Sequence, residues 1–290
     1  MRGDLHCHTK LSDGSMGIDD LIVLAKKREV DTIAITDLDC LAGTTRAKLI
    51  GERHGINVIQ GVELSSYDGE SEREVHILSY LNDSPDRLEG LCHRNLAARK
   101  RAAQYMMLKA AQRYPITPDL VLKCAQGSTN VYPVHIMAAL VESGMTTELY
   151  GELYNELFNS RSSKNIIVRP KLPDPVEIIE AIHEAGGIAV LARACSFSGT
   201  NVIERLAENG LDGLEIWHPG CDDGTSKELM DYAEGKNMIT VGGSVFKGRY
   251  NEQCVTIGTY ITPEDKFNDF MNYKAKNRRQ HKAKVAVGEK

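Results

Sequence analysis

The chain has 290 residues, of which 42% are hydrophobic and 26% charged, a composition ordinary for a globular protein with a substantial core. Its formal net charge of -5 argues against a dedicated nucleic-acid binder, and no run approaches the roughly eighteen apolar residues that a membrane span needs. The N-terminus lacks a signal-peptide pattern, and the seven cysteines are odd in number with no Cys-x-x-Cys pair. We therefore expect a cytoplasmic protein with free thiols, and neither a nucleic-acid nor a membrane partner.

Strands and helices alternate along the first part of the chain. The patterns predict strands over 5–8, 31–37, 56–60 and 74–80, and helices over 17–28 and 44–54. This alternation is typical of βα units in a largely parallel sheet or barrel. Polar residues collect where the strands end, at Asp37, at Glu63 and in the turn that holds Asp13. Barrel enzymes keep their sites at that end of the strands.

The middle of the chain has a helical pattern without strands. Between residues 83 and 165 the patterns predict helices over 85–114, 119–126, 134–143 and 147–159, and none of this region reads as a core strand. We predict that residues 83–165 form an inserted helical subdomain, and that residues 1–82 and 166–290 form the barrel. Helix faces of the insertion could pair with a second subunit, which would make a homo-oligomer, or they could pack on the barrel.

The βα rhythm resumes after a loop over 161–175 that contains a short β stretch. Helices are predicted over 177–185, 201–209 and 226–234, and strands over 187–192, 213–217 and 238–242. The stretch from Met271 to Lys290 is basic and poor in apolar residues. A solvated or frayed terminus explains it better than a nucleic-acid arm.

His6 and His8 form the strongest local motif. Alternate side chains of a strand share a face, so the two imidazoles should point the same way, while Cys7 faces the core. Asp13 lies in a Ser-Asp-Gly turn that can fold its carboxylate back toward them. Two imidazoles and a carboxylate suit Zn, Mn or Fe, although a strand with two half-buried histidines is the simpler alternative for His-x-His alone.

Several motifs resemble the polymerase-and-histidinol-phosphatase (PHP) family. They are Asp-Leu-His6-Cys-His8-Thr with Asp13-Gly, Ala-Ile-Thr-Asp37, Gly-Val-Glu63-Leu-Ser, Val-His76-Ile-Leu, the strand that ends at Ala192, and Gly-Gly-Ser244. The resemblance covers the whole chain, insertion included. It implies an α/β fold, a distorted seven-stranded (β/α) barrel with a site for up to three divalent metals. The reaction it implies is hydrolysis of phosphate esters, with a phosphosugar, cyclic phosphate or nucleotide as substrate.

Only part of the family's ligand set is present. The resemblance assigns His6, His8, Asp13, Glu63 and His76 as metal ligands. At four other ligand positions this chain has Leu38, Arg193, Val245 and Lys247. Leu38 and Val245 offer no lone pair, Arg193 stays protonated, and Lys247 is a cation unless strongly perturbed. We therefore expect one weakly held metal (Mn, Zn or Fe) at reduced occupancy, or none.

The same cations could bind an anion. Arg193 and Lys247 suit a phosphate, and Arg249, His135 and Lys164 are weaker candidates for contacts to it. Asp13 and His218 are the candidate catalytic groups, His218 because it follows the strand over 213–217. Two hypotheses remain: a phosphoesterase for a small phosphorylated metabolite, or a catalytically silent barrel that binds a phosphorylated ligand, inorganic phosphate or a partner protein.

Overall fold

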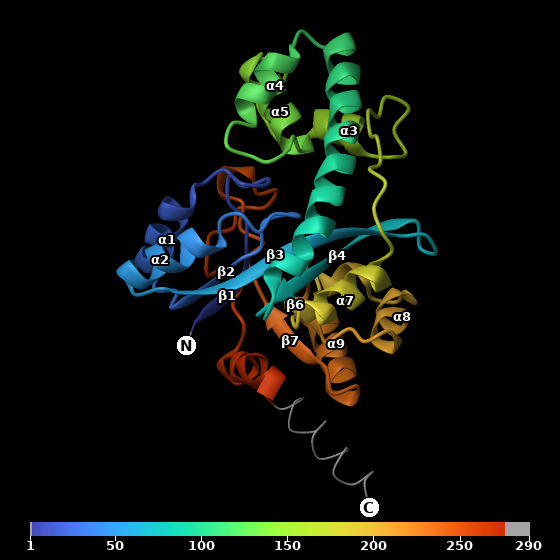
Figure 1. The fold of residues 1–290 in the computed structure, drawn as a ribbon. Coiled ribbons are helices and arrows are strands. Elements are labelled where there is room, and N and C mark those ends of the chain that lie inside the picture. Colours follow the sequence, from blue (N-terminus) through green and yellow to red (C-terminus); the bar gives the residue numbers. More distant parts are fainter. Residues whose placement is uncertain (1, 276–290) are drawn as a thin grey trace, which may run out of the picture.

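The computed structural model describes residues 2–275, and within them one sheet of seven strands curls into a nearly closed barrel (Figure 1). The strands are β1 (Gly3–Cys7), β2 (Thr32–Ile35), β3 (Asn57–Asp68), β4 (Arg73–Tyr80), β5 (Ile188–Leu191), β6 (Gly213–Trp217) and β7 (Ile239–Gly242). They follow one another in chain order, and β4 is antiparallel to both its neighbours, whereas the other neighbouring pairs are parallel. An isolated parallel bridge between Cys7 and Phe246, beyond the end of β7, links the two edges of the sheet. The predicted seven-stranded α/β barrel is confirmed.

The helices lie close to their predicted positions. They are α1 (Ile18–Lys27), α2 (Thr44–His54), α3 (Glu89–Arg113), α4 (Pro118–Cys124), α5 (Pro133–Glu142), α6 (Glu152–Phe158), α7 (Pro175–Glu184), α8 (Val202–Glu208) and α9 (Asp223–Gly235). Short 3-10 helices lie between these elements at η1 (Pro85–Leu88), η2 (Ala194–Phe197) and, after β7, η3 (Gly248–Tyr250). A last helix covers residues 264–275.

Two local predictions are wrong. The helix expected over 147–159 begins only at Glu152, because Gly151 before it has an extended backbone. The short β stretch expected within 161–175 is a loop, since Asn159 and Ser162 bond to nearby backbone groups and offer them an alternative to a ladder.

The twelve-residue strand β3 is the element that places the site. Its first part pairs in parallel with β2 and its second part pairs antiparallel with β4, so one strand joins the two halves of the barrel. The sequence pattern predicted only its beginning, over 56–60. Glu63 lies in the middle of this strand, paired with Leu78 of β4 and bridged to Leu38 beyond β2.

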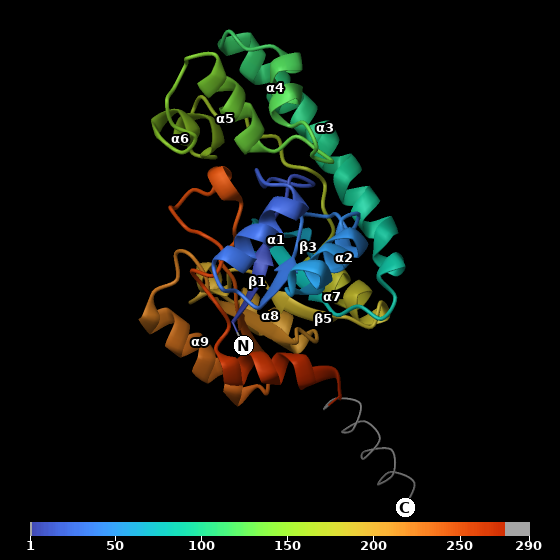
Figure 2. The same cartoon turned by 90° about the vertical axis from the view of Figure 1, so that its left-hand side faces the viewer.

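The helices between β4 and α7 stand over one end of the barrel, with α4, α5 and α6 above it (Figure 2). The start of α3 packs on the barrel core through Leu91 and Cys92. Its far end builds a separate core in which Met107 and Ala110 join Ile136 of α5. Because α3 contributes to both cores, packing does not separate the insertion from the barrel. The predicted ends of the insertion, at residues 83 and 165, therefore stay predictions.

The opposite end of the barrel is closed by the helix over 264–275. Phe267 and Phe270 from this helix pack with Leu5, Tyr80 and Val241 of the strands. Of the basic stretch from Met271 to Lys290, residues 271–275 belong to this helix, which the sequence patterns did not predict, and the rest lies outside the described residues. Among helices of residues 2–275, we find none with the length and apolar character of a membrane span.

Replacing Phe270 with alanine should lower the free energy of unfolding by about 3–5 kcal/mol, because its ring is fully buried and meets Tyr80 edge-on at 5.3 Å. Urea denaturation followed by circular dichroism measures this. Met271→Ala is the control, because the side chain of Met271, next to Phe270 in the chain, is 41% exposed. This substitution should lower the free energy of unfolding by no more than about 0.5 kcal/mol. Equal losses in both variants would show that the helix does not close the barrel.

Candidate metal and phosphate site

Three side chains meet at the rim of the barrel below the helical insertion. Nε2 of His6 lies 3.0 Å from Nε2 of His8, as expected for two residues on one face of a strand. The carboxylate atom Oε2 of Glu63 lies 3.5 Å from the first nitrogen and 3.3 Å from the second. All three side chains are buried, so the predicted ligands His6, His8 and Glu63 converge on one point.

The spacing of these three atoms fits a metal ion. Ligand atoms placed about 2.0–2.2 Å from zinc lie about 3.3–3.6 Å apart at the corners of a tetrahedron. The two imidazole lone pairs and the carboxylate oxygen of Glu63 have nearly that spacing. These residues therefore fit one divalent ion with an open coordination position.

Carboxylates behind the two imidazoles hold them in this orientation. Nδ1 of His6 donates to Oε1 of Glu215 at 2.8 Å, and Nδ1 of His8 lies 3.0 Å from Oδ1 of Asp13. Such partners leave Nε2 free to act as a ligand and raise its basicity. Burial lowers the pKa of His6, but the charges of Glu215 and Glu63 outweigh it and raise the pKa to about 9.

The sequence analysis missed Glu215. It lies in β6, it is fully buried, and it also accepts a hydrogen bond from the backbone N–H of Arg193 at 2.8 Å. An acidic residue inside the apolar run Gly-Leu-Glu-Ile-Trp was a usable signal, because a buried carboxylate almost always has a partner.

Asp13 is paired with a lysine. Nζ of Lys247 lies 2.7 Å from Oδ2 of Asp13. Burial would raise the pKa of Asp13, but Lys247 and His8 hold it far below its usual value. Asp13 is therefore an ionised carboxylate at neutral pH, suited to act as a ligand, a base or a charge partner and not as a proton donor.

Arg193 stands beside the second oxygen of Glu63. Its guanidinium lies 3.7 Å from Oε1 of Glu63, and Nδ1 of His76 lies 3.5 Å from the same atom. Both Oε1 and Nδ1 are buried without a hydrogen-bond partner in the described part of the chain. The predicted ligand His76 thus reaches the site, but it shares this side of Glu63 with a cation.

Two apolar residues complete the altered rim. Leu38 packs against Tyr132 and Val134 of the insertion and Tyr250 of the loop after β7. Val245 has a left-handed backbone with φ of 46°, which is an outlier for a β-branched residue and easier for aspartate. Neither side chain can ligate a metal.

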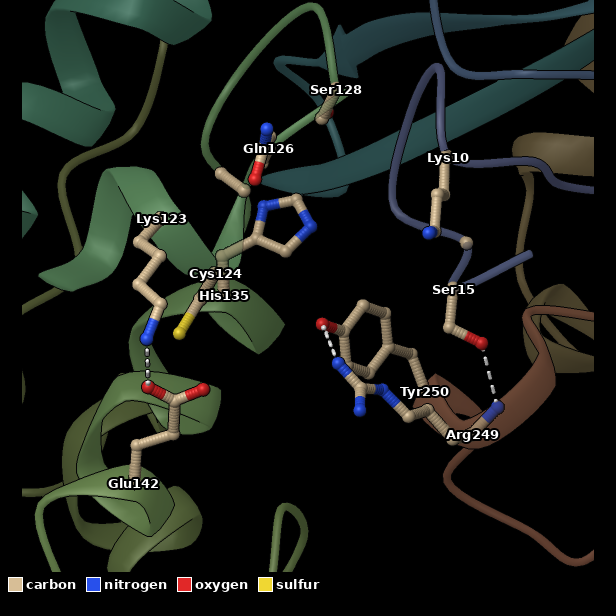
Figure 3. A pocket seen from close by; sticks show the side chains of 12 residues that line it. Lys10, Ser15, Lys123, Cys124, Gln126, Ser128, His135, Glu142, Arg249 and Tyr250 are labelled. Atoms are coloured by element: carbon tan, nitrogen blue, oxygen red, sulfur yellow. Dashed lines mark hydrogen bonds and ion pairs between the residues drawn. The ribbon is translucent and has the colours of Figure 1, made fainter. Parts of the chain in front are cut away.

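A pocket of about 370 Å³ adjoins this rim (Figure 3). Lys10 and Arg249 line it on the barrel side, and His135 lines it from α5. Its wall is continuous with the Asp13–Lys247 pair, because the backbone N–H of Ser15 donates to the carbonyl of Lys247 at 2.9 Å. Lys10 was not identified from the sequence, where an isolated lysine carries no signal.

His135 presents a neutral ring to the pocket. Its Nδ1 accepts a hydrogen bond from the backbone N–H of Tyr132 at 3.1 Å, so the ring proton lies on Nε2. Burial lowers its pKa to about 4, and its ring meets that of Tyr250 at a centroid distance of 5.7 Å. His135 can therefore donate to a phosphate oxygen without adding charge.

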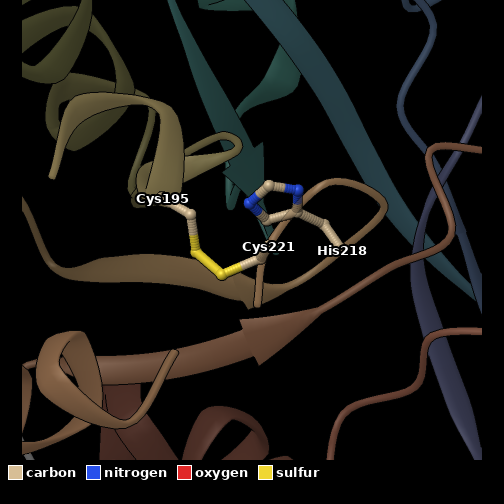
Figure 4. A group of neighbouring side chains, drawn as sticks. All are labelled: Cys195, His218 and Cys221. Carbon is tan, nitrogen blue, oxygen red and sulfur yellow. A yellow bond between two sulfur atoms is a disulfide. The ribbon is translucent and has the colours of Figure 1, made fainter. Parts of the chain in front are cut away.

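Neither of the two remaining candidates lines this pocket. Lys164 is 65% exposed, is paired with Glu156 at 3.1 Å and does not line this pocket. His218 lies at the end of β6 beside Cys195 and Cys221 (Figure 4). These cysteines form a disulfide, so the prediction of free thiols is wrong for this pair. The ends of the neighbouring strands β5 and β6 bring their Cα atoms within 5.6 Å, a distance that a disulfide spans.

Lys247→Met should tighten Mn²⁺ binding about tenfold or more, because it removes a cation that repels a dication and frees Asp13. Equilibrium dialysis measures the affinity. Lys123→Met is the matched control, since Lys123 lies on the far side of the pocket, 71% exposed and paired with Glu142. Unchanged affinity in Lys247→Met would show that the lysine does not oppose the metal.

Glu215→Gln should weaken zinc binding about 10–100-fold, because the amide oxygen can still accept from His6 but no longer raises its basicity. Competition with a chromophoric chelator measures this. Glu204→Gln removes an exposed carboxylate paired with Lys236 and should leave the affinity unchanged. An equal affinity for both variants would contradict the anchoring role.

Comparisons with known proteins identify relatives of this chain. The PHP domain family model matches residues 4–133. The phosphoribosyl 1,2-cyclic phosphate 1,2-diphosphodiesterase of Eggerthella lenta is 31% identical over 252 residues, which cover 85% of this chain and 94% of that one. The 5'-3' exoribonuclease of Haemophilus influenzae is 28% identical over 252 residues, covering 84% and 89%. A solved structure from Bifidobacterium adolescentis, described as a metal-dependent phosphoesterase, superposes with a TM-score of 0.82 at 27% identity, covering 92% of this chain and 94% of that chain. The chain therefore belongs to the PHP domain family.

Proposed function

We propose that this chain is a metal-dependent phosphoesterase that hydrolyses a small phosphorylated metabolite. The observation that carries the proposal is the convergence of His6, His8 and Glu63 at the spacing of metal ligands, beside a pocket lined by cations. The family membership and the names of the relatives support the same class of reaction.

The residues of the chain have distinct roles in this proposal. His6, His8 and Glu63 hold one divalent ion, which when bound would lower the pKa of water and polarise a phosphoryl oxygen. Lys247 and Arg193 face the phosphate and neutralise its negative charge. His135 and Arg249 orient it from the pocket wall, where Arg249 also donates to the hydroxyl of Tyr250 at 3.1 Å.

The substrate we propose is a cyclic phosphate of a sugar or the phosphorylated end of a nucleotide. A pocket of about 370 Å³ is at the small end of the range for ligand sites, which suits a single sugar or nucleotide unit. The relative that acts on phosphoribosyl 1,2-cyclic phosphate supports the first substrate. The exoribonuclease relative supports the end of an RNA strand as a second substrate. The net charge of -5 favours the smaller ligand.

A second candidate is a barrel that binds a phosphorylated ligand without hydrolysing it. The ion pair between Lys247 and Asp13 favours this alternative, because a cation occupies a corner that the resemblance assigns to metal. The site then keeps its affinity for anions while its capacity for metal falls.

A turnover assay separates the candidates. The protein, supplied with manganese, should release product from a cyclic phosphosugar or from a short 5'-phosphorylated oligonucleotide, and a chelator should stop the reaction reversibly. Glu63→Gln should abolish turnover, whereas Glu70→Gln, which changes an exposed residue of the β3–β4 hairpin, should not. Phosphate binding by calorimetry without turnover under any metal would favour the silent barrel.

A combined variant tests the altered rim directly. Leu38→His, Arg193→His, Val245→Asp and Lys247→His together supply four donors in place of two apolar and two cationic side chains. Activity in the unsubstituted chain, with only a further rise in the variant, supports the phosphoesterase. Activity confined to the variant would overturn it.

A further inference from the structure

A second cluster of potential ligands shares no residue with the His6–His8–Glu63 group. Cys195 belongs to η2 after β5, and His218 and Cys221 belong to the loop after β6 (Figure 4). Because β5 and β6 are parallel neighbours, both segments leave the sheet at the same rim. One ligand atom from each residue lies within 4.8 Å of the other two.

The imidazole of His218 is fixed with one nitrogen free. Its Nδ1 donates to the carbonyl of Pro219 at 2.8 Å, which leaves the lone pair on Nε2. Nε2 is buried and has no hydrogen-bond partner within the described residues, while the side chain is 2% exposed overall. In Figure 4 this nitrogen points toward the two sulfur atoms. A buried nitrogen left unpaired costs free energy that a ligand would recover.

The donor set suits a soft divalent ion. Two thiolates and one neutral imidazole match a common three-residue zinc set with one open position. The two thiolate charges balance a dication. The charges of Glu215, Arg193 and His6 also act on His218, the first opposite in sign to the other two.

The cysteines can change state. They form a disulfide in this structure, and both side chains are partly exposed, so small thiols and disulfides can reach them. Cys7, Cys40 and Cys92, by contrast, are free and buried.

We propose that Cys195, His218 and Cys221 form a redox-gated zinc site, which binds the ion as a dithiol and releases it on forming the disulfide. The oxidant is a low-molecular-weight disulfide such as oxidised glutathione. One thiolate attacks it and displaces a glutathione thiolate, and the second thiolate then displaces the other. One S–S bond breaks in the oxidant, one forms in the protein, two electrons pass to glutathione, and the ion leaves.

Cobalt substitution tests the proposal in the full chain. Protein reduced with dithiothreitol, desalted without oxygen and titrated with Co²⁺ should show thiolate-to-cobalt charge-transfer absorption that rises to a plateau, whose amplitude corresponds to one sulfur-ligated ion per chain. Oxidised glutathione should abolish this absorption and release one equivalent. The His6–His8–Glu63 site cannot produce the signal, because it contains no sulfur.

Single variants assign the ligands. Cys195→Ser and Cys221→Ser should each lose most of the absorption, and His218→Ala should weaken cobalt binding at least tenfold. Cys254→Ser is the control, since Cys254 is free and exposed and should leave the signal intact. Reduced natural protein without the absorption, or an undiminished signal in Cys195→Ser, would overturn the proposal, and the first result requires no variant to fold.

Discussion

The rim of this barrel is arranged around one buried carboxylate. Glu63 is 2% exposed, and a charge taken so far from water must be paired. One oxygen faces His6 and His8, and the other faces His76 and Arg193. Burial alone would raise the pKa of Glu63, but His76 and His6 hold it well below its usual value. The switch of β3 from parallel to antiparallel pairing places this carboxylate at the centre of the rim.

Internal cations divide the rim into two halves. On the His6 side, Glu215 orients an imidazole and the lone pairs converge as they would on a metal. Near Asp13 and Glu63, Lys247 and Arg193 supply positive charge from the protein itself. A phosphate carries the opposite charge to these side chains, so the changes that oppose metal favour an anion. The chemistry of the site therefore depends on whether metal binding by the histidines or anion binding by Lys247 and Arg193 is stronger.

The helical insertion is joined to the same rim. The amide of Asn95 in α3 donates to Asp39 at 2.8 Å, and the guanidinium of Arg99 donates to Ser65 at 2.8 Å. Leu38 adds an apolar contact to Tyr132 at a position where the family resemblance implies a histidine. Cap and barrel therefore meet through residues next to the site, and the pocket forms where they meet.

The sequence by itself predicted most elements of the barrel and the shared face of His6 and His8, because strand periodicity is a local property. The family resemblance added Glu63 to this pair. It also identified Lys247 and Arg193 as departures from the family. Only the tertiary structure decided their partners. Glu215 lies 209 residues from His6 in the chain, and Lys247 reaches Asp13 only because the loop after β7 closes onto the turn after β1. The Cys195–Cys221 pair likewise depends on β5 and β6 being neighbours. Contacts between residues so far apart follow from how the sheet closes, which no local pattern records.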